Sequence, residues 1–164
     1  VPVHNRAYVS HRPYIKPLSD VLDAYGRYGV ILVGREGARL FLFNLGELAE
    51  ATGTLGEEVR RTKHGGASGV TGMRGGMSAR AGRREDAVVQ RNLKEVAEAA
   101  GAFCASNACT RLVLGGTDQN VSRLYDMLPK ALQEQVIGSF SVDVGALEGE
   151  VQSRSMDLIE EMAQ

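Results

Sequence analysis

The fold is decided at residues 28–45, which read Tyr28-Gly-Val-Ile-Leu-Val-Gly-Arg-Glu-Gly-Ala-Arg-Leu-Phe-Leu-Phe-Asn-Leu45. Residues 28–34 form a nearly unbroken apolar run, which is typical of a strand that is covered on both faces. Residues 35–37 predict a turn, and residues 38–45 carry apolar side chains on both faces. The stretch therefore predicts a buried β-hairpin. A third strand is expected around residues 47–54, although residues 48–51 could equally form one helical turn.

Helices and further strands are expected on both sides of this hairpin. A helix over residues 18–27 is expected before it, and residues 84–107 have the strongest helical pattern, since their apolar side chains step by four and three. That stripe consists of Val89, Leu93, Val96, Ala100 and Phe103. Beyond it we expect a strand at 111–114 and a helix through 127 with Leu124, Tyr125 and Leu128 inward. A short helical turn that starts at Pro129, a strand at 136–144 and a helix at 147–162 follow. This order predicts an α/β domain with a mixed five-stranded sheet and helices on both faces.

Composition limits the class of protein. The chain has 164 residues and a net charge of −1, which fits one domain (17–164) after an irregular arm (1–16), and any affinity for anions must come from uneven charge distribution. No run approaches the roughly 18–20 apolar residues that span a bilayer, so we expect a cytoplasmic protein without a membrane partner. Cys104 and Cys109 form neither a disulfide framework nor a complete zinc site, so we expect small buried side chains and no cofactor or metal.

Residues 63–84 break every periodic pattern. Seven glycines lie between Gly65 and Gly82, and seven basic residues lie between positions 60 and 84. Because glycine loses the most backbone entropy on ordering, we expect a long flexible loop between the third strand and the main helix. Basic side chains among glycines suit a phosphate backbone, and Gly75-Gly76 can present consecutive N–H groups to an anion. The alternative interpretation is a surface linker that happens to be basic.

Two short motifs in this loop carry a resemblance. Lys63-His64-Gly65 is followed, after eight further residues, by Arg74-Gly75-Gly76-Met77-Ser78-Ala79. The pair resembles the Lys-His-Gly and Arg-Gly-Gly-Gln-Ser-Ala motifs in the central domain of eukaryotic-type and archaeal peptide chain release factors, in the superfamily that includes Pelota. The surrounding order of elements is also similar, and the likeness covers most of residues 18–164. The main departure is Met77, which stands where the family has Gln.

The resemblance implies an RNase H-like fold and a site at the large ribosomal subunit. Implied partners are ribosomal RNA, the acceptor end of peptidyl-tRNA and, through other domains, a translational GTPase. The implied reaction is hydrolysis of the peptidyl-tRNA ester in termination or ribosome rescue, at Gly75, Gly76 and Met77. The residues expected to contact RNA phosphate are Lys63, His64, Arg74, Ser78, Arg80, Arg83 and Arg84. Met77 weakens the hydrolase prediction because it has no side-chain amide to orient water, although its backbone N–H remains.

Three alternatives stay open beside this one. The same loop suits a binding module for RNA or the ribosome without catalysis, and the domain could also be a scaffold without an RNA role. A metal-dependent nuclease needs converging carboxylates, but the first two predicted strands have none and Asp118 and Asp143 are isolated. Residues 115–118 read as an ordinary strand-to-helix turn with Thr117 as the N-cap rather than as a phosphate-binding loop.

Overall fold

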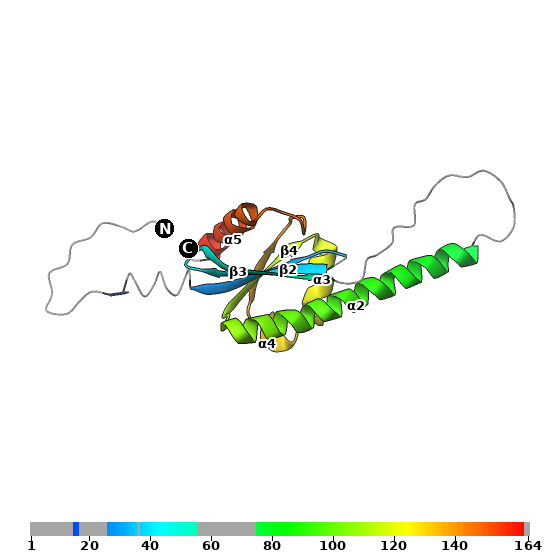
Figure 1. Ribbon diagram of the computed structural model, residues 1–164, viewed down its shortest axis with the longest axis horizontal. Helices are drawn as coiled ribbons and strands as arrows, with labels where there is room; N and C mark the ends of the chain where they lie inside the picture. The colour runs from blue at the N-terminus through cyan, green and yellow to red at the C-terminus, as the bar shows by residue number, and fades with distance from the viewer. Residues whose placement is uncertain (1–14, 17–25, 36, 56–74, 163–164) are drawn as a thin grey trace.

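The computed structural model of the chain describes residues 15–16, 26–35, 37–55 and 75–162, with the backbone alone described for residues 54–55 and 75–82 (Figure 1). The predicted arm at 1–16 lies almost wholly outside these ranges, as does most of the predicted helix at 18–27. The first part of the predicted loop, with Lys63, His64 and Arg74, also lies outside the described residues.

One sheet of five strands forms the centre of the molecule, in the order β3-β2-β1-β4-β5. The strands are β1 (Arg27–Val33), β2 (Gly37–Asn44), β3 (Glu47–Leu55), β4 (Arg111–Gly116) and β5 (Val136–Phe140). β1 and β2 pair antiparallel, as do β2 and β3, whereas β4 lies parallel to both β1 and β5. The predicted hairpin is therefore confirmed, and residues 47–55 are a strand rather than a helical turn.

Helices cover both faces of this sheet (Figure 1). α2 (Gly75–Asn107), α3 (Asp118–Met127) and the short α4 (Lys130–Gln133) lie on one face, and α5 (Glu148–Met162) lies on the other. Each face has its own apolar cluster, because side chains alternate along a strand. Ile31, Leu40 and Leu114 face α2 and α3, while Val30, Phe41 and Phe43 face α5. The predicted mixed α/β architecture is confirmed.

Several local predictions can be checked against this fold. The apolar stripe of the main helix is buried from Val89 to Phe103. Thr117 is the N-cap of α3, and its hydroxyl oxygen accepts a hydrogen bond from the Asn120 backbone N–H at 3.4 Å. Tyr125 was expected to face inward but is 39% exposed, since one step along the helix turns it about 100° from buried Leu124.

The last strand is shorter than predicted. β5 ends at Phe140, four residues before position 144, because the chain turns at Asp143. The Gly145 N–H donates to Asp143 Oδ1 at 2.7 Å, and the Ala146 N–H donates to the Asp143 carbonyl at 3.0 Å. Arg39 Nη1 then donates to the Ala146 carbonyl at 2.6 Å. These bonds replace a strand ladder and lead the chain into α5.

Cys104 and Cys109 are both buried as free thiols, as predicted. The Cys109 N–H donates to the Cys104 carbonyl at 3.1 Å where α2 ends. A hydrogen bond with the Cys109 thiol, together with burial, raises the pKa of Cys104 above its usual value. The pair behaves as small apolar packing at the end of the helix.

Candidate nucleic-acid interface

The long helix begins earlier than the sequence suggests. We expected residues 63–84 to be a loop, but α2 starts at Gly75, so residues 75–84 have helical backbone. Starting a helix is costly, whereas each residue added to an existing helix brings one more hydrogen bond. The packed part of α2 supplies the start, and Ala79, Arg80 and Ala81 are good helix formers that extend it past Gly82. The expected loop is thus wrong for its second half.

The first part of α2 extends past the edge of the sheet (Figure 1). Arg83 and Arg84 are exposed, and Val89 is the first buried residue among the described side chains of the helix. Gly75 and Val89 are 14 positions apart, which corresponds to roughly 21 Å of helix. Residues 75–86 therefore form a projecting segment of α2, called the rod below, and the Gly75-Gly76-Met77 tripeptide lies at its far end.

The turn between β1 and β2 contacts the helix near the place where it leaves the body. Arg35 Nη2 donates to Glu85 Oε1 at 2.8 Å. The buried amide of Asn92 donates through Nδ2 to the Arg35 backbone carbonyl at 3.1 Å. The turn itself is closed by the Gly34 N–H, which donates to the Gly37 carbonyl at 2.8 Å. One residue of the turn thus meets α2 at two points, seven residues apart along the helix.

Four exposed basic residues lie along the described part of α2, two of which were predicted from sequence. Arg83 and Arg84 were expected to contact RNA phosphate, whereas Arg91 and Lys94 were missed. Seven residues are almost two helical turns, so Arg84 and Arg91 lie nearly in line, with Lys94 one turn further on the same side. From 84 to 94 this row covers roughly 15 Å of helix. The signal that would have found it is the seven-residue spacing of the arginines.

The N-terminal end of α2 has its own electrostatic character. The first four N–H groups of a helix have no partner within that helix, and here they include those of Gly75, Gly76 and Met77. The aligned peptide dipoles add the equivalent of roughly half a positive charge at this end. Backbone donors alone therefore make it attractive to phosphate or to a developing oxyanion.

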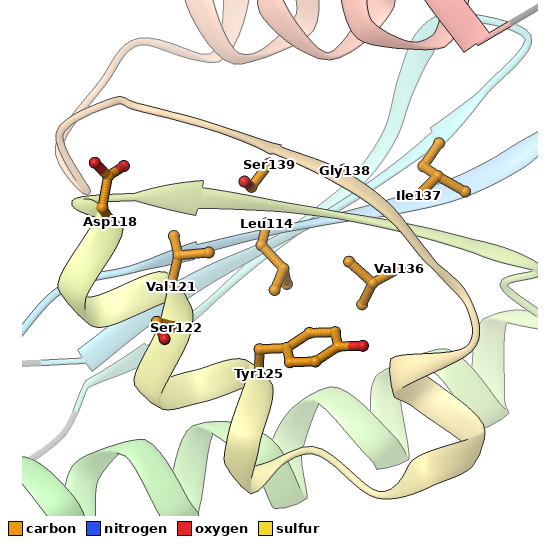
Figure 2. Close-up of a pocket in the computed structure, with 9 residues that line it drawn as sticks. All are labelled: Leu114, Asp118, Val121, Ser122, Tyr125, Val136, Ile137, Gly138 and Ser139. Atoms are coloured by element: carbon orange, nitrogen blue, oxygen red, sulfur yellow. The ribbon is translucent and has the colours of Figure 1, made fainter.

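A hollow lies between α3 and β5, and sequence reasoning did not find it (Figure 2). Its volume is about 480 Å³. Val121, Tyr125 and Val136 give it an apolar wall, and Asp118 and Ser139 lie at one end (Figure 2). In the part of the chain that the structure describes, β5 is an edge strand beside this groove.

Two further features concern metals and membranes. Within the described ranges, no three His, Cys, Asp or Glu side chains come together in a way that would hold a metal ion. None of the helices described here combines the length and apolar character needed to cross a bilayer.

Solved structures show where this fold occurs. The crystal structure of the archaeal translation termination factor aRF1 superposes with a TM-score of 0.52 at 15% sequence identity, over 90% of this chain and 43% of that one. A structure described as an archaeal protein matches at 14% identity and a TM-score of 0.46, over 98% of this chain and 46% of its own. The chain thus spans less than half of the length of these proteins. The aRF1 likeness shows a shared fold.

Sequence comparisons give the family. No curated protein matches the chain. The model of a family described as bacterial archaeo-eukaryotic release factor family 10 matches residues 13–160, which is most of the chain. The match includes the β-hairpin, the segment with the glycine-rich motifs and all of α2. The chain therefore belongs to bacterial archaeo-eukaryotic release factor family 10.

Proposed function

We propose that this domain binds the large ribosomal subunit near the tRNA acceptor end and presents Gly75-Gly76-Met77 there, at the tip of α2. Membership of a release-factor family supports a role in translation. The observation that carries the finer proposal is that the tripeptide lies at the beginning of a helix that projects from the body. A projecting rod can enter a narrow RNA-lined site while the body stays outside it.

The basic side chains on the described part of α2 support RNA as the surface that it meets. Arg84 lies before Val89, on the projecting part, whereas Arg91 and Lys94 lie after it, beside exposed Glu95. Glu85 is held at the body by its ion pair with Arg35. Cations in a row displace counterions from a phosphate backbone, which gives affinity that falls with salt. Lys63, His64 and Arg74 belong to the same proposal on the strength of the motif resemblance.

Catalysis at the tip would use backbone groups. Hydrolysis of the peptidyl-tRNA ester passes through a tetrahedral oxyanion, which backbone N–H donors stabilise. The helix start supplies such donors at Gly76 and Met77. Met77 has no amide side chain with which to orient the attacking water, so we expect release to be slow relative to a factor with Gln at this position.

Met77 also favours a second candidate function, a ribosome-binding module without hydrolase activity. Such a domain would occupy the same site through the basic row and the helix end, in stalled-ribosome rescue or regulation. The two candidates agree on where the domain binds and differ only in chemistry. A release assay therefore separates them.

The first experiment is co-sedimentation of the protein with ribosomes at several salt concentrations. We expect binding that weakens steeply with salt. The Arg84→Gln/Arg91→Gln variant should reduce the slope of log affinity against log salt by roughly 0.7–0.9 for each phosphate that it no longer neutralises. Arg154→Gln, which removes an exposed arginine on α5, is the matched control. Binding that is indifferent to salt and to the paired change would contradict an RNA interface.

The second experiment measures peptide release from ribosomes that carry labelled peptidyl-tRNA. Native protein, Met77→Gln and Gly76→Ala are compared at equal ribosome occupancy. We expect Met77→Gln to release peptide faster than the native chain and Gly76→Ala to release it more slowly. Bound ribosomes without release by any form, Met77→Gln included, would remove the hydrolase and leave the binding module.

A further inference from the structure

The projecting end of α2 depends on the body for its direction. From Val89 onward the helix is held by buried side chains, whereas residues 83 and 84 are exposed. The β1–β2 turn contacts α2 on both sides of Val89: Arg35 pairs with Glu85 before it, and Asn92 after it donates to the Arg35 carbonyl. The residues that fix this junction also fix the direction in which the tip points.

Asn92 is unusual in its surroundings. Its side chain is 1% exposed, and among the described residues of α2 it is the one buried polar group. Its neighbours on the buried face, Val89, Leu93 and Val96, pack against the sheet without directional preference. The hydrogen bond from this amide to the Arg35 carbonyl forms in one register, because a helix that slides or rotates breaks it. Asn92 therefore specifies how α2 sits on the turn.

Arg35 adds a second constraint at a distance along the helix. Glu85 and Asn92 are seven residues apart, so they lie on the same side of α2 and are separated by roughly 10 Å. The Arg35 carbonyl receives the Asn92 amide, and the Arg35 guanidinium reaches Glu85 at 2.8 Å. Two contacts along one side of a rod restrain its tilt as well as its rotation, which a single contact cannot do.

Because the projecting part of α2 is long, a small tilt at its base displaces its tip by a larger distance. Gly75 is 17 residues from Asn92, or roughly 25 Å along the helix. A tilt of about 5° at Asn92 therefore moves the tip by about 2 Å, on the same helix rise. Misplacement of reacting groups by about 1 Å can cost a factor of about 100 in rate. An ion pair of little value to stability can thus matter greatly to function.

We propose that Arg35 and Asn92 are positioning residues that aim the projecting end of α2, an inference that rests on the proposed function of that end. Neither residue touches the substrate in this scheme. Their loss changes where the tip lies and leaves the packed body as it is. Asn92→Leu replaces the amide with an apolar side chain of similar size that favours helix, so the body should stay folded while tip placement is lost.

Pulsed electron resonance on the free protein tests the aiming directly. One spin label is placed at position 79 on the rod and the other at exposed Glu134 on the body. Cys104 and Cys109 are buried, so the parent chain without added cysteines is the labelling control. We expect the distance distribution to shift or broaden by about 2 Å or more in Arg35→Gln and in Asn92→Leu relative to the parent, from the lever length.

The swapped variant Arg35→Glu/Glu85→Arg restores the ion pair and should restore the parental distribution. Arg154→Gln, which breaks the exposed Arg154–Glu150 pair at 3.0 Å on α5, should leave it unchanged. Distances that are the same in the parent, Arg35→Gln and Asn92→Leu would overturn the proposal. Arg35→Gln lies on an exposed turn and keeps the test valid if Asn92→Leu fails to fold.

The ribosome assays then separate this proposal from the proposed function. With an active parent, Arg35→Gln and Asn92→Leu should release peptide at least tenfold more slowly although both variants are folded, and the swap should recover most of the rate. Full release activity in both single variants would show that the direction of the projecting end does not affect function. A parent that neither binds ribosomes nor releases peptide would refute the proposed function alone. The spin-label distances, measured on the free protein, test separately whether Arg35 and Asn92 fix the direction of α2.

Discussion

Proline at position 87 tests whether the first part of α2 is an independent rod. Ala87 is exposed and lies between the helix start and Val89, the first buried residue of the described part. Proline inside a helix removes one hydrogen bond, clashes with the preceding turn and costs about 3 kcal/mol. Each residue of an unpacked helix adds at most about 0.3 kcal/mol, so the twelve residues from Gly75 to Asp86 contribute about 3 kcal/mol. Each of their three glycines lowers this helix stability by about 1 kcal/mol.

The rod is therefore close to balance, and Ala87→Pro should unfold it while the body stays folded. We expect a loss of helical ellipticity corresponding to about twelve residues and a change in unfolding free energy below about 1 kcal/mol. Near-ultraviolet dichroism of the tyrosines follows the body. Ala102→Pro, at an exposed position in the packed half of α2, should lower the unfolding free energy by about 3 kcal/mol. Equal losses for the two prolines would refute the rod, and ribosome binding and release at parental levels in Ala87→Pro would refute its role.

Three further changes test the fold. Leu45 has φ 54° at the β2–β3 turn, so Leu45→Gly should raise the unfolding free energy by about 1 kcal/mol in denaturant titration, and no gain would mean that Leu45 packing compensates. Burial raises the pKa of Tyr28 above 10.0, so the folded state keeps the phenol neutral where the unfolded chain loses the proton. The free energy of unfolding should therefore fall above about pH 10, by up to about 1.4 kcal/mol per pH unit. The fall should be shallower in Tyr28→Phe. A Cβ on Gly116 would lie 2.5 Å from the Val33 carbonyl, at φ 147°, so Gly116→Ala should cost more than about 1 kcal/mol. Gly53→Ala, with open space around it, should be neutral or stabilising, and equal effects of the two alanines would refute the packing argument.

The elements that could be predicted from sequence are those whose burial produces a local pattern of apolar residues. The apolar run at 28–34 gave the central strand, and the steps from Val89 to Phe103 gave the buried face of α2. The end of β5 could not be found in this way. Val142 and Val144 continue the alternation and pack on the α5 side of the sheet, but they do so outside the strand. Alternation reports burial, and only the hydrogen-bond partners define the strand.

The start of α2 was missed for a different reason. Glycine content is a local signal, whereas helix extension is cooperative and depends on the residues further along the helix, here the packed segment from Val89. The junction was beyond sequence reasoning altogether. Arg35 meets Glu85 and Asn92 across 50 and 57 positions of chain, and no pattern in one sequence reports contacts of that range. The motif predicted the candidate tip, and only the fold showed the contacts of Arg35 with α2.

The early start of α2 also changes what Met77 can do. A residue in the first helical turn keeps a backbone N–H that has no partner within the helix, and the first turn tolerates proline, which lacks this N–H. Met77→Ala removes the side chain and keeps the donor, whereas Met77→Pro removes both. If the backbone donor acts at the ester, Met77→Ala should release peptide at nearly the parental rate. Met77→Pro should then lose about 100-fold or more at equal ribosome occupancy, as for loss of an oxyanion donor. Equal rates for the two variants would show that the N–H at this position takes no part, and the tip would then act by occupancy alone.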